Sequence, residues 1–256
     1  MITLKKPAEA EKMRKAGQVV ADIHKAIRDA IKPGVDTMTL DLVAERVLER
    51  ESARASFKGY RVSGVRVPFP NAICVSVNDE VVHGIPNGSR FLDEGDIVSI
   101  DVGAEVEGYH GDAASTYAVG RVSAKREELL YVTRRALYIG IEQVLPGHTI
   151  GDIGHAIEQW VLGKGYGLVR DYSGHGIGRK MHEPPQVPNY GKPGSGLTIR
   201  PGLTFCIEPM VMNGQEPVRN VDNGWTVVTC DGSDAAHFEH TILVTEEGAE
   251  ILTPWE

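Results

Sequence analysis

Two acidic residues, Asp101 and Asp112, stand among apolar neighbours near the middle of the sequence. The segments 97–102 and 113–119 are typical of strands, and residues 105–108 have the composition of a tight hairpin turn. We therefore expect both aspartates to lie on one antiparallel hairpin.

If that turn is centred between Val106 and Glu107, Asp101 and Asp112 are direct cross-strand partners. Such partners point to the same face of the sheet with Cβ atoms roughly 5 Å apart, where two like charges repel and weaken the sheet. The spacing therefore predicts a positive group between the two carboxylates.

Three later segments each add one side chain that can bind a metal ion. His175 lies between glycines, Glu208 follows a strand-like run, and Glu239 lies in a third apolar segment. Two aspartates, one histidine and two glutamates form an oxygen-rich set with a single nitrogen, which suits a pair of divalent ions better than one tetrahedral zinc. The sequence therefore predicts a dinuclear metal site made of Asp101, Asp112, His175, Glu208 and Glu239.

The amino-acid composition indicates a globular protein with a large core and argues against some functions. The chain has 256 residues, of which 41% are hydrophobic, enough for a large core in one domain, residues 1–256, or in two closely joined halves. Its formal charge of −8 argues against a nucleic-acid-binding surface. The basic pairs Lys125-Arg126 and Arg134-Arg135 lie on a predicted helix, and we interpret them as a solvated face.

The cysteines and the N-terminal residues indicate the cellular compartment in which we expect the protein. Cys74, Cys206 and Cys230 are odd in number and lack metal-finger spacing, so we expect no disulfide framework and a reducing compartment. Residues 1–6 run into a charged helical pattern instead of an apolar signal core. No apolar run approaches the roughly 20 residues that a membrane helix needs. We expect a cytoplasmic protein without a membrane partner.

The first 50 residues predict two helices. After Pro7, apolar side chains recur at three-to-four spacing from Met13 to Ile31, and they do so again from Leu40 to Leu48. Pro33-Gly34 separates the two runs.

The same arrangement returns later in the chain, with a helix-like segment 125–144, then Pro146-Gly147, then a periodic run 153–161. The two copies overlay without gaps at an offset of 113 residues, which places Gly34 on Gly147, Leu40 on Ile153, Glu45 on Glu158 and Val47 on Trp160. We infer two halves related by a pseudo-twofold axis, with ligands from both halves meeting at the centre.

The other elements are short, β-branched strands. They are predicted at residues 74–77, 203–207, 225–229 and 238–245, and the glycine-rich stretch 191–196 is expected to be a surface loop. Helices packed on an antiparallel sheet, an α+β fold, are what these elements favour.

Seven motifs in one order carry a resemblance to a known family. They are Val82-His83-Gly84-Ile85-Pro86, Ile100-Asp101-Val102-Gly103, Tyr109-His110-Gly111-Asp112, Gly174-His175-Gly176-Ile177-Gly178, Met181-His182-Glu183-Pro184, Ile207-Glu208-Pro209-Met210 and His237-Phe238-Glu239-His240-Thr241. Nearly the whole chain resembles the type I methionine aminopeptidases of the bacterial kind, metallopeptidases of family M24 with the pita-bread fold.

The resemblance implies roles for the residues at the matching positions. Two divalent ions, of cobalt, manganese, iron, nickel or zinc, would be held by the five ligands above, with Asp112 and Glu239 bridging. Glu208 would also shuttle a proton from the bridging water to the leaving amine. His83 would lie near the scissile amide, and His182 would donate to the carbonyl oxygen.

The resemblance also implies a pocket for the methionine side chain. Its walls would be Tyr60, Phe69, Cys74, His83, Met181 and Trp225. Two features depart from the family's common pattern: the stretch from Arg61 to Pro68 is several residues longer, and Met181 stands where phenylalanine is frequent. The longer loop would either reshape the rim near the second and third substrate residues or form a solvated insertion.

Six further histidines have weaker signals. His24 and His155 lie on predicted helices, and His148 follows Pro-Gly, so a surface or structural place is expected. His110, His237 and His240 adjoin the motifs, and any of the three could orient a ligand.

Three alternatives stay open beside removal of an N-terminal methionine with a small second residue. Prolidases and aminopeptidases P share the ligand types and fold but usually carry an extra N-terminal domain. Type II methionine aminopeptidases carry an insertion between the equivalents of His182 and Glu208. A metal-free binding module is the non-enzymatic alternative. The expected substrates are nascent polypeptides and N-terminal Met peptides, the family precedent is monomeric, and contact with the ribosome stays open.

Overall fold

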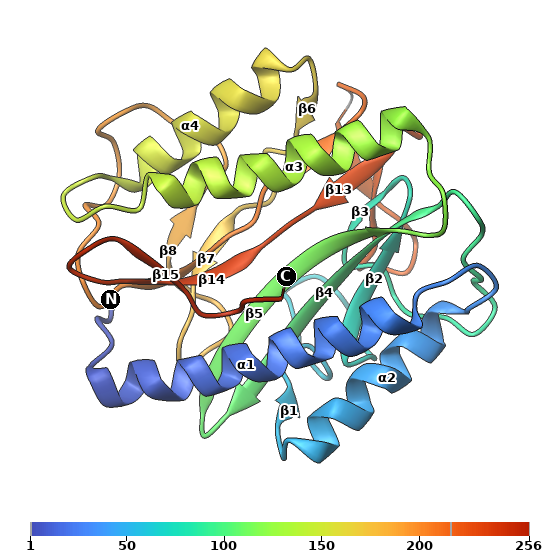
Figure 1. Ribbon diagram of the computed structural model, residues 1–256, viewed down its shortest axis with the longest axis horizontal. Coiled ribbons are helices and arrows are strands. Elements are labelled where there is room, and N and C mark those ends of the chain that lie inside the picture. The colour runs from blue at the N-terminus through green and yellow to red at the C-terminus, as the bar shows by residue number, and fades with distance from the viewer. Residues whose placement is uncertain (1, 216, 256) are drawn as a thin grey trace.

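Four helices enclose antiparallel strands in the computed structural model, which describes residues 2–215 and 217–255. In Figure 1 α1 and α2 run along the lower side, α3 and α4 along the upper side, and the strands lie between them. The helices are α1 (Pro7–Ala30), α2 (Thr37–Arg50), α3 (Ala124–Glu142) and α4 (Ile150–Gly163). The predicted α+β class is confirmed.

Local sequence explains where the first two helices begin. Pro7 occupies the first turn of α1, where its missing N–H is not needed, and the Glu9 carboxylate accepts from the backbone N–H of Lys6 at 3.0 Å. Asp36 precedes α2 and accepts from the backbone N–H of Thr39 at 2.9 Å. The predicted apolar face of α1 is buried, with Met13 at 0% exposure.

The repeat at an offset of 113 residues is present in the backbone. Helix α2 spans residues 37–50 and α4 spans 150–163, so both ends shift by the same number. Gly34 and Gly147, each just before one of these helices, both have positive φ, at 84° and 95°. Because only glycine adopts this conformation without strain, the pair of Pro-Gly sites fixes both turns.

Fifteen short strands form the sheets of the described chain. They are β1 (Arg54–Ala55), β2 (Ile73–Val77), β3 (Glu80–Val82), β4 (Ile97–Val106), β5 (Tyr109–Ala118), β6 (Gly167–Leu168), β7 (Gly174–Gly176), β8 (Glu183–Val187), β9 (Thr204–Ile207), β10 (Met210–Met212), β11 (Val218–Asn220), β12 (Val227–Thr229), β13 (Ala235–His237), β14 (His240–Val244) and β15 (Ala249–Ile251).

Two of the sheets carry most of the candidate site. In the first, β4 pairs with β5 along its whole length and with β2 and β1 on its other edge. The second has the order β15-β14-β9-β7-β8, with all pairs antiparallel. The three-stranded sheets β13-β10-β6 and β11-β12-β3 supply the remaining strands.

The predicted register of the central hairpin is wrong by two residues. Val106 pairs with Tyr109, so the turn consists of Glu107 and Gly108, at φ 51° and 78°. The predicted centre would have put positive φ on Val106, which a β-branched residue resists, whereas Gly108 accepts it. Asp101 therefore lies opposite Ala114, and Asp112 opposite Gly103. A shift of two residues preserves the face, so both aspartates still point to the same side of the sheet.

Two glycines let helix α1 pack closely on β5 and on the segment that follows β15. A Cβ atom on Gly111 would lie 2.9 Å from the backbone nitrogen of Gly17, and one on Gly17 would lie 1.9 Å from the Leu252 carbonyl oxygen. Such close backbone approach leaves no room for side chains. This contact fixes the outer face of the hairpin that carries both aspartates.

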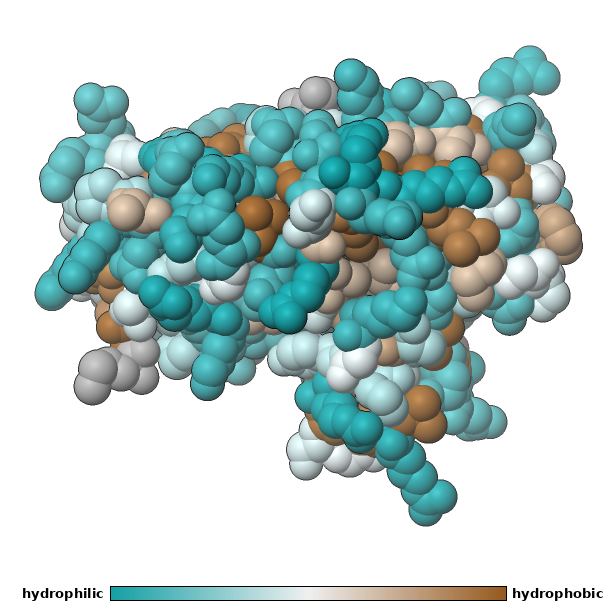
Figure 2. All heavy atoms as spheres, turned by 90° about the horizontal axis from the view of Figure 1, so that it is seen from below, coloured by the Kyte–Doolittle hydropathy of each residue, from teal (hydrophilic) through white to brown (hydrophobic). Residues whose placement is uncertain are grey.

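The surface matches the charge-rich composition. Figure 2 shows a face on which hydrophilic residues predominate, with hydrophobic residues in smaller groups between them. Single apolar side chains such as Val67 and Tyr131 are exposed, at 62% and 57%. None of the helices in the described chain is both long enough and apolar enough to cross a bilayer.

Candidate metal centre

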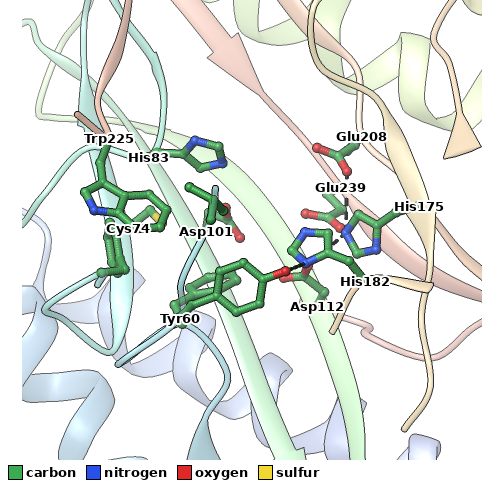
Figure 3. A pocket seen from close by; sticks show the side chains of 13 residues that line it. Tyr60, Cys74, His83, Asp101, Asp112, His175, His182, Glu208, Trp225 and Glu239 are labelled. Carbon is green, nitrogen blue, oxygen red and sulfur yellow. Dashed lines mark hydrogen bonds and ion pairs between the residues drawn. The ribbon is translucent and has the colours of Figure 1, made fainter. Parts of the chain in front are cut away.

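The five predicted ligands converge on one place from five separate segments. Asp101 comes from β4, Asp112 from β5 and His175 from β7, while Glu208 directly follows β9 and Glu239 lies between β13 and β14. Figure 3 shows their side chains directed towards a common centre. Both sheets and both halves of the chain therefore contribute to the site.

The side chains of the group lie close together without forming short hydrogen bonds to one another. His175 Nε2 lies 3.5 Å from Asp112 Oδ2 and 3.7 Å from Glu208 Oε1. These separations exceed a normal hydrogen bond. His175 Nδ1 lies 2.9 Å from the Gly176 carbonyl oxygen, which accepts from it and so leaves Nε2 free to act as a ligand.

The carboxylates carry unpaired oxygens in buried positions, which is what a cation site requires. Asp101 Oδ1, Asp112 Oδ1 and Glu239 Oε1 are buried without a hydrogen-bond partner among the described residues. A buried polar atom left unpaired is costly, and an uncompensated buried charge more so. The donor set therefore fits divalent cations, which would neutralise these groups.

The pKa values of these groups express the same uncompensated charge. Burial, and then the neighbouring Asp112 carboxylate, raises the pKa of Asp101 well above its ordinary value. Burial also raises the pKa of Glu239 well above its usual range, and Asp112 adds to the effect. Burial alone lowers the pKa of His175, but the adjacent carboxylates outweigh it and the net direction is upward.

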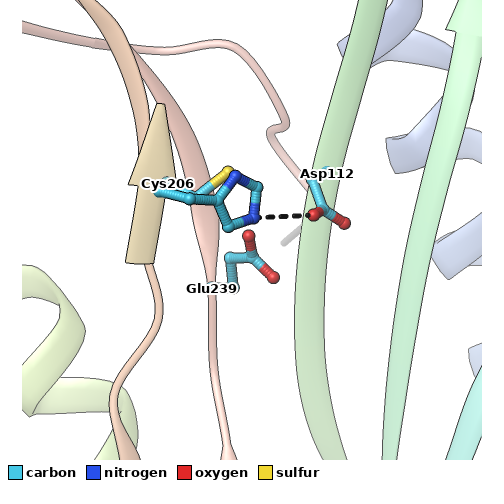
Figure 4. A group of neighbouring side chains, drawn as sticks. Asp112, Cys206 and Glu239 are labelled. Carbon is cyan, nitrogen blue, oxygen red and sulfur yellow. Dashed lines mark ion pairs between the residues drawn. The ribbon is translucent and has the colours of Figure 1, made fainter. Parts of the chain in front are cut away.

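Cys206 lies against this group and was not singled out from the sequence. Figure 4 shows its sulfur beside Asp112 and Glu239, and the Cys206, Asp112, His175 and Glu239 ligand atoms all lie within 4.8 Å of one another. Burial raises the pKa of the thiol well above its ordinary value, which keeps it neutral. Cys206 lies in β9, two residues before Glu208, which directly follows that strand, and this spacing is the signal that could have found it.

Two further histidines lie at the site: Figure 3 shows His83 near Asp101 and His182 beside His175, and the His175 and His182 rings have centroids 4.2 Å apart. His83 has a left-handed backbone with φ 59°, rare for a non-glycine residue, and burial lowers the pKa of its ring to about 4. His182 lies at the cavity mouth in contact with solvent, yet desolvation by the surrounding protein lowers the pKa of its ring, and His175 adds to this. Both rings are therefore neutral at pH 7.

Tyr60 is joined to His182 by a hydrogen bond. The phenolic oxygen lies 2.7 Å from His182 Nδ1, and the two rings have centroids 5.1 Å apart. Burial raises the pKa of the Tyr60 hydroxyl, so it keeps its proton. The sequence predicted both residues at the site but not their contact.

A cavity of about 230 Å³ opens beside the carboxylates. Besides the five predicted ligands it is lined by Phe57, Tyr60, Val62, Phe69, Cys74, His83, His182 and Trp225. Phe69 and Trp225 meet edge to face with ring centroids 5.3 Å apart, and Phe57 stands against Phe69 at 6.4 Å. One end of the cavity is therefore apolar and aromatic, and the other is acidic.

The structure does not bring Met181 to the cavity wall. Its side chain is 3% exposed and packs in an apolar cluster with Ile177 and Tyr109, with its methyl group over Gly103. The residue next to it, His182, does line the cavity. Phe57 and Val62 line the cavity instead, although no sequence signal marked them.

The long loop from Arg61 to Pro68 touches the cavity at two places. Val62 is a lining residue, and the Val67 carbonyl oxygen accepts from the Trp225 indole N–H at 2.9 Å. The two loop arginines, Arg61 and Arg66, are exposed. The loop is thus tied to a wall residue while its charged side chains face solvent.

The other histidines fall into two groups. His24 is fully buried between the Tyr117 hydroxyl and the Ala113 carbonyl, whereas His155 is half-buried on α4. His148 Nδ1 lies 3.1 Å from the Gln143 carbonyl oxygen.

Of the histidines next to the motifs, His237 and His240 are buried and His110 is half-buried. His110 contacts the Ser56 hydroxyl at 2.8 Å, and His240 stacks on Trp255. His237 is 2% exposed and lies 3.7 Å from Glu208 Oε2.

Known proteins match the chain over nearly its whole length. Methionine aminopeptidase 1 of Bacillus subtilis is 49% identical over 253 residues, 99% of each chain. Methionine aminopeptidase of Escherichia coli is 41% identical over 98% of this chain and 94% of its own. The solved methionine aminopeptidase of Thermotoga maritima superposes with a TM-score of 0.95 at 48% identity, covering 99% of both chains.

More distant structures share only the fold. The prolidase of Pyrococcus furiosus superposes with a TM-score of 0.76 at 23% identity and covers 99% of this chain but 66% of its own. The model of metallopeptidase family M24 matches residues 11–246. This chain belongs to metallopeptidase family M24.

Proposed function

We propose that this chain is a metal-dependent aminopeptidase that removes the N-terminal methionine from peptides and nascent polypeptides when the second residue is small. The observation that supports this most strongly is the cluster of four carboxylates and His175 at the acidic end of an aromatic cavity. The relatives at 41–49% identity, named methionine aminopeptidases, agree with it.

Membership of family M24 implies divalent metal binding, and we propose two ions per chain. Four carboxylates carry four negative charges, which two divalent ions neutralise. Asp112 and Glu239 would bridge, with Asp101 on one side and His175 and Glu208 on the other. The ions, of cobalt, manganese, iron, nickel or zinc, would supply a water with a pKa near about 7 and polarise the scissile carbonyl.

Glu208 is the proposed proton carrier. Its side chain is 13% exposed at the cavity wall, so it reaches the substrate space without being freely solvated. As a carboxylate it can take a proton from the attacking water and pass it to the leaving amine.

His182 is the proposed donor to the substrate carbonyl oxygen, and Tyr60 sets its tautomer. The Tyr60 hydroxyl retains its proton and can donate it to His182 Nδ1 at 2.7 Å. The ring hydrogen then sits on Nε2, from which a neutral imidazole donates to the oxygen as negative charge develops. His83, also neutral, would hold the scissile amide from the other side of the cavity.

The apolar end of the cavity is the proposed methionine pocket, with Tyr60, Phe69, Cys74 and Trp225 as walls. Aromatic faces suit a thioether, which makes favourable contacts with rings. An unbranched side chain also enters a narrow cavity of this volume more readily than a branched one. The acidic end would hold the free α-amine.

We further propose that residues 1–256 form one domain that acts as a cytoplasmic monomer. The free cysteines Cys74, Cys206 and Cys230 are consistent with a reducing compartment. The net charge of −8 gives no reason to expect a nucleic acid or membrane partner. Contact with the ribosome has no support in the chain and is not part of the proposal.

A peptide series tests the exopeptidase assignment. Free Met-Ala-Ser should release methionine, whereas N-acetyl-Met-Ala-Ser should be inert because its blocked amine cannot be held. Met-Xaa-Ser peptides with Ala, Gly or Ser as Xaa should be cleaved faster than those with Leu or Phe. Equal cleavage of the acetylated peptide would contradict the proposal.

We propose that the loop of residues 61–68 influences which second residue of the substrate is accepted. Replacing residues 61–68 by a short turn should change the rank order of the Met-Xaa-Ser series, because Val62 lines the cavity and Val67 holds Trp225. An unchanged rank order would leave the loop as a solvated insertion.

A further inference from the structure

The Glu208 carboxylate lies between two imidazole rings, of which only one belongs to the ligand set. His175 Nε2 is 3.7 Å from Oε1, and His237 Nε2 is 3.7 Å from Oε2. Among residues 2–215 and 217–255 no other nitrogen is recorded in an ion pair or hydrogen bond with this carboxylate. Each oxygen of Glu208 thus has its own histidine.

His237 is held so that its side chain cannot turn away easily. Its backbone N–H donates to the Thr116 hydroxyl at 2.9 Å, and the same hydroxyl donates to its carbonyl oxygen at 2.9 Å. It also pairs with Met210 at the end of β13. With the backbone fixed on both sides, the ring is 2% exposed and directed at the site.

His237 Nε2 is a buried atom without a hydrogen-bond partner in the described chain. Native proteins rarely leave such an atom unpaired, so it needs a partner that the side chains can supply. Two partners are within reach. One is a cation shared with Glu208 and Glu239, since one ligand atom of each of the three residues lies within 4.8 Å of the others, and the second is the Glu208 carboxylate itself.

The ligand set of the proposed function decides between the two partners. One of the two proposed ions would already be held by His175, Glu208 and the shared carboxylates Asp112 and Glu239, and a catalytic ion keeps a position open for water, so that ion needs no second imidazole. The Glu208 carboxylate is therefore the partner of His237 Nε2. The 3.7 Å gap is longer than a hydrogen bond, but the last torsion of a glutamate has broad minima, and a small rotation brings Oε2 into range.

We propose that His237 is a positioning residue for Glu208, donating its Nε2 hydrogen to Oε2 and keeping Oε1 directed towards His175. This inference rests on the proposed function, because it assigns a partner to the proposed proton carrier. Without the second imidazole the carboxylate would rotate freely and spend less time in the reactive orientation. Hydrogen-bond partners of metal-binding side chains commonly change activity or affinity by about 10–100-fold.

Two variants at one position test the proposal. His237→Leu has a similar volume and no donor, and His237→Gln keeps an N–H donor at comparable reach. Each would be loaded with cobalt(II), and four quantities compared with those of wild type: cobalt content, the visible absorption spectrum, kcat and KM for Met-Ala-Ser, and thermal unfolding. The spectrum reports how Glu208 meets the metal and does not depend on turnover.

The expected result is specific to a positioning role. His237→Leu should lower kcat about 10–100-fold, leave KM and cobalt content near wild type, and alter the spectrum. His237→Gln should restore most of kcat and the wild-type spectrum. If leucine prevents folding, His237→Asn, whose amide is too short to reach Oε2, should give the same loss.

Two results would overturn the proposal. Wild-type kcat and spectrum in His237→Leu would show that Glu208 needs no second histidine. Loss of bound cobalt in both variants would make His237 a ligand. An inactive wild-type enzyme would instead remove the proposed function, and the spectra would still decide whether His237 acts on Glu208.

Discussion

Asp112 and Glu239 are almost completely buried, at 3% and 2% exposure, and each keeps an oxygen without a partner. A bridging ligand serves two ions at once, so Asp112→Ala or Glu239→Ala should abolish tight metal binding. Calorimetric titration with manganese or cobalt measures this directly. The surface variant Glu107→Ala, which removes an exposed acid paired with Lys15, is the matched control and should bind as wild type. Full occupancy with near-normal turnover in either bridging variant would remove that assignment.

Substitutions at His182 and at Tyr60 should lower turnover by different factors. His182→Ala removes the proposed carbonyl donor and should lower turnover by roughly 10²–10³ with metal content intact. Tyr60→Phe removes only the hydrogen bond to Nδ1 and should cost about tenfold. Turnover on Met-Ala-Ser and metal analysis of both variants check this. Metal loss in His182→Ala would assign His182 to the ligands, and a Tyr60→Phe variant as active as wild type would remove the tautomer argument.

His24 gives a residue-scale prediction about stability. Burial lowers the pKa of this histidine to about 4, below its unfolded value of 6.5. Between pH 4 and 6.5 His24 is protonated in the unfolded chain but not in the folded one. Its contribution to the free energy of unfolding is therefore fully present above pH 6.5 and is lost as the pH falls towards 4. The contribution lost between pH 7 and 4 is roughly 3 kcal/mol.

Urea unfolding at pH 7 and pH 4 measures the difference. Carboxylates titrate in the same range, so the comparison is with His24→Leu, which should lose less free energy of unfolding between the two pH values. Equal losses in both proteins would show that His24 titrates normally.

At the scale of elements, the packing of α1 against the segment that follows β15 depends on a glycine. A Cβ at Gly17 would lie 1.9 Å from the Leu252 carbonyl, so Gly17→Ala should destabilise the fold by about 1–3 kcal/mol as α1 is pushed outward. Gly163 is also helical, at the exposed end of α4, with nothing within 4 Å of its Cβ position. Gly163→Ala should be neutral or slightly stabilising. Denaturant unfolding of both variants checks this, and similar values would contradict the packing account.

Long periodic elements were predictable and short strands were not. The apolar spacing found all four helices to within a few residues, because each buries one continuous face. Strands such as β6 and β13, of two and three residues, have no internal pattern and exist only through pairing with β10. The hairpin register depends on which residues accept positive φ. Gly108 does so readily, and the turn therefore lies at Glu107-Gly108 instead of at the position that would pair Asp101 with Asp112.

At the scale of the whole molecule, the structure brings the predicted site residues together where chemistry restricts the residue type. Buried acids and a histidine among glycines are rare enough to stand out, and the structure brings all five together. Pocket walls are apolar residues like those of any core, so Met181 was placed at the wall and Phe57 and Val62 were missed. Cys206 was missed although it lies two residues before Glu208, whereas His237, two residues before Glu239, was among the three histidines expected to be able to orient a ligand.

The repeat explains why the site lies at the centre. Helices α2 and α4, offset by 113 residues (37 to 150 and 50 to 163), mark two similar halves. The first half supplies Asp101 and Asp112, and the second supplies His175, Glu208 and Glu239. Neither half alone holds all five predicted ligands.

Removal and return of metal tests the central claim most directly. The protein would be stripped with chelator, one divalent metal restored at a time, and release of the first residue followed from Met-Ala-Ser, Leu-Ala-Ser and Ala-Pro-Ala. Metal-dependent cleavage confined to the methionine peptide is the predicted result. Cleavage only before proline would keep the five ligands but contradict the methionine pocket, and no cleavage with any metal would contradict the enzymatic function itself.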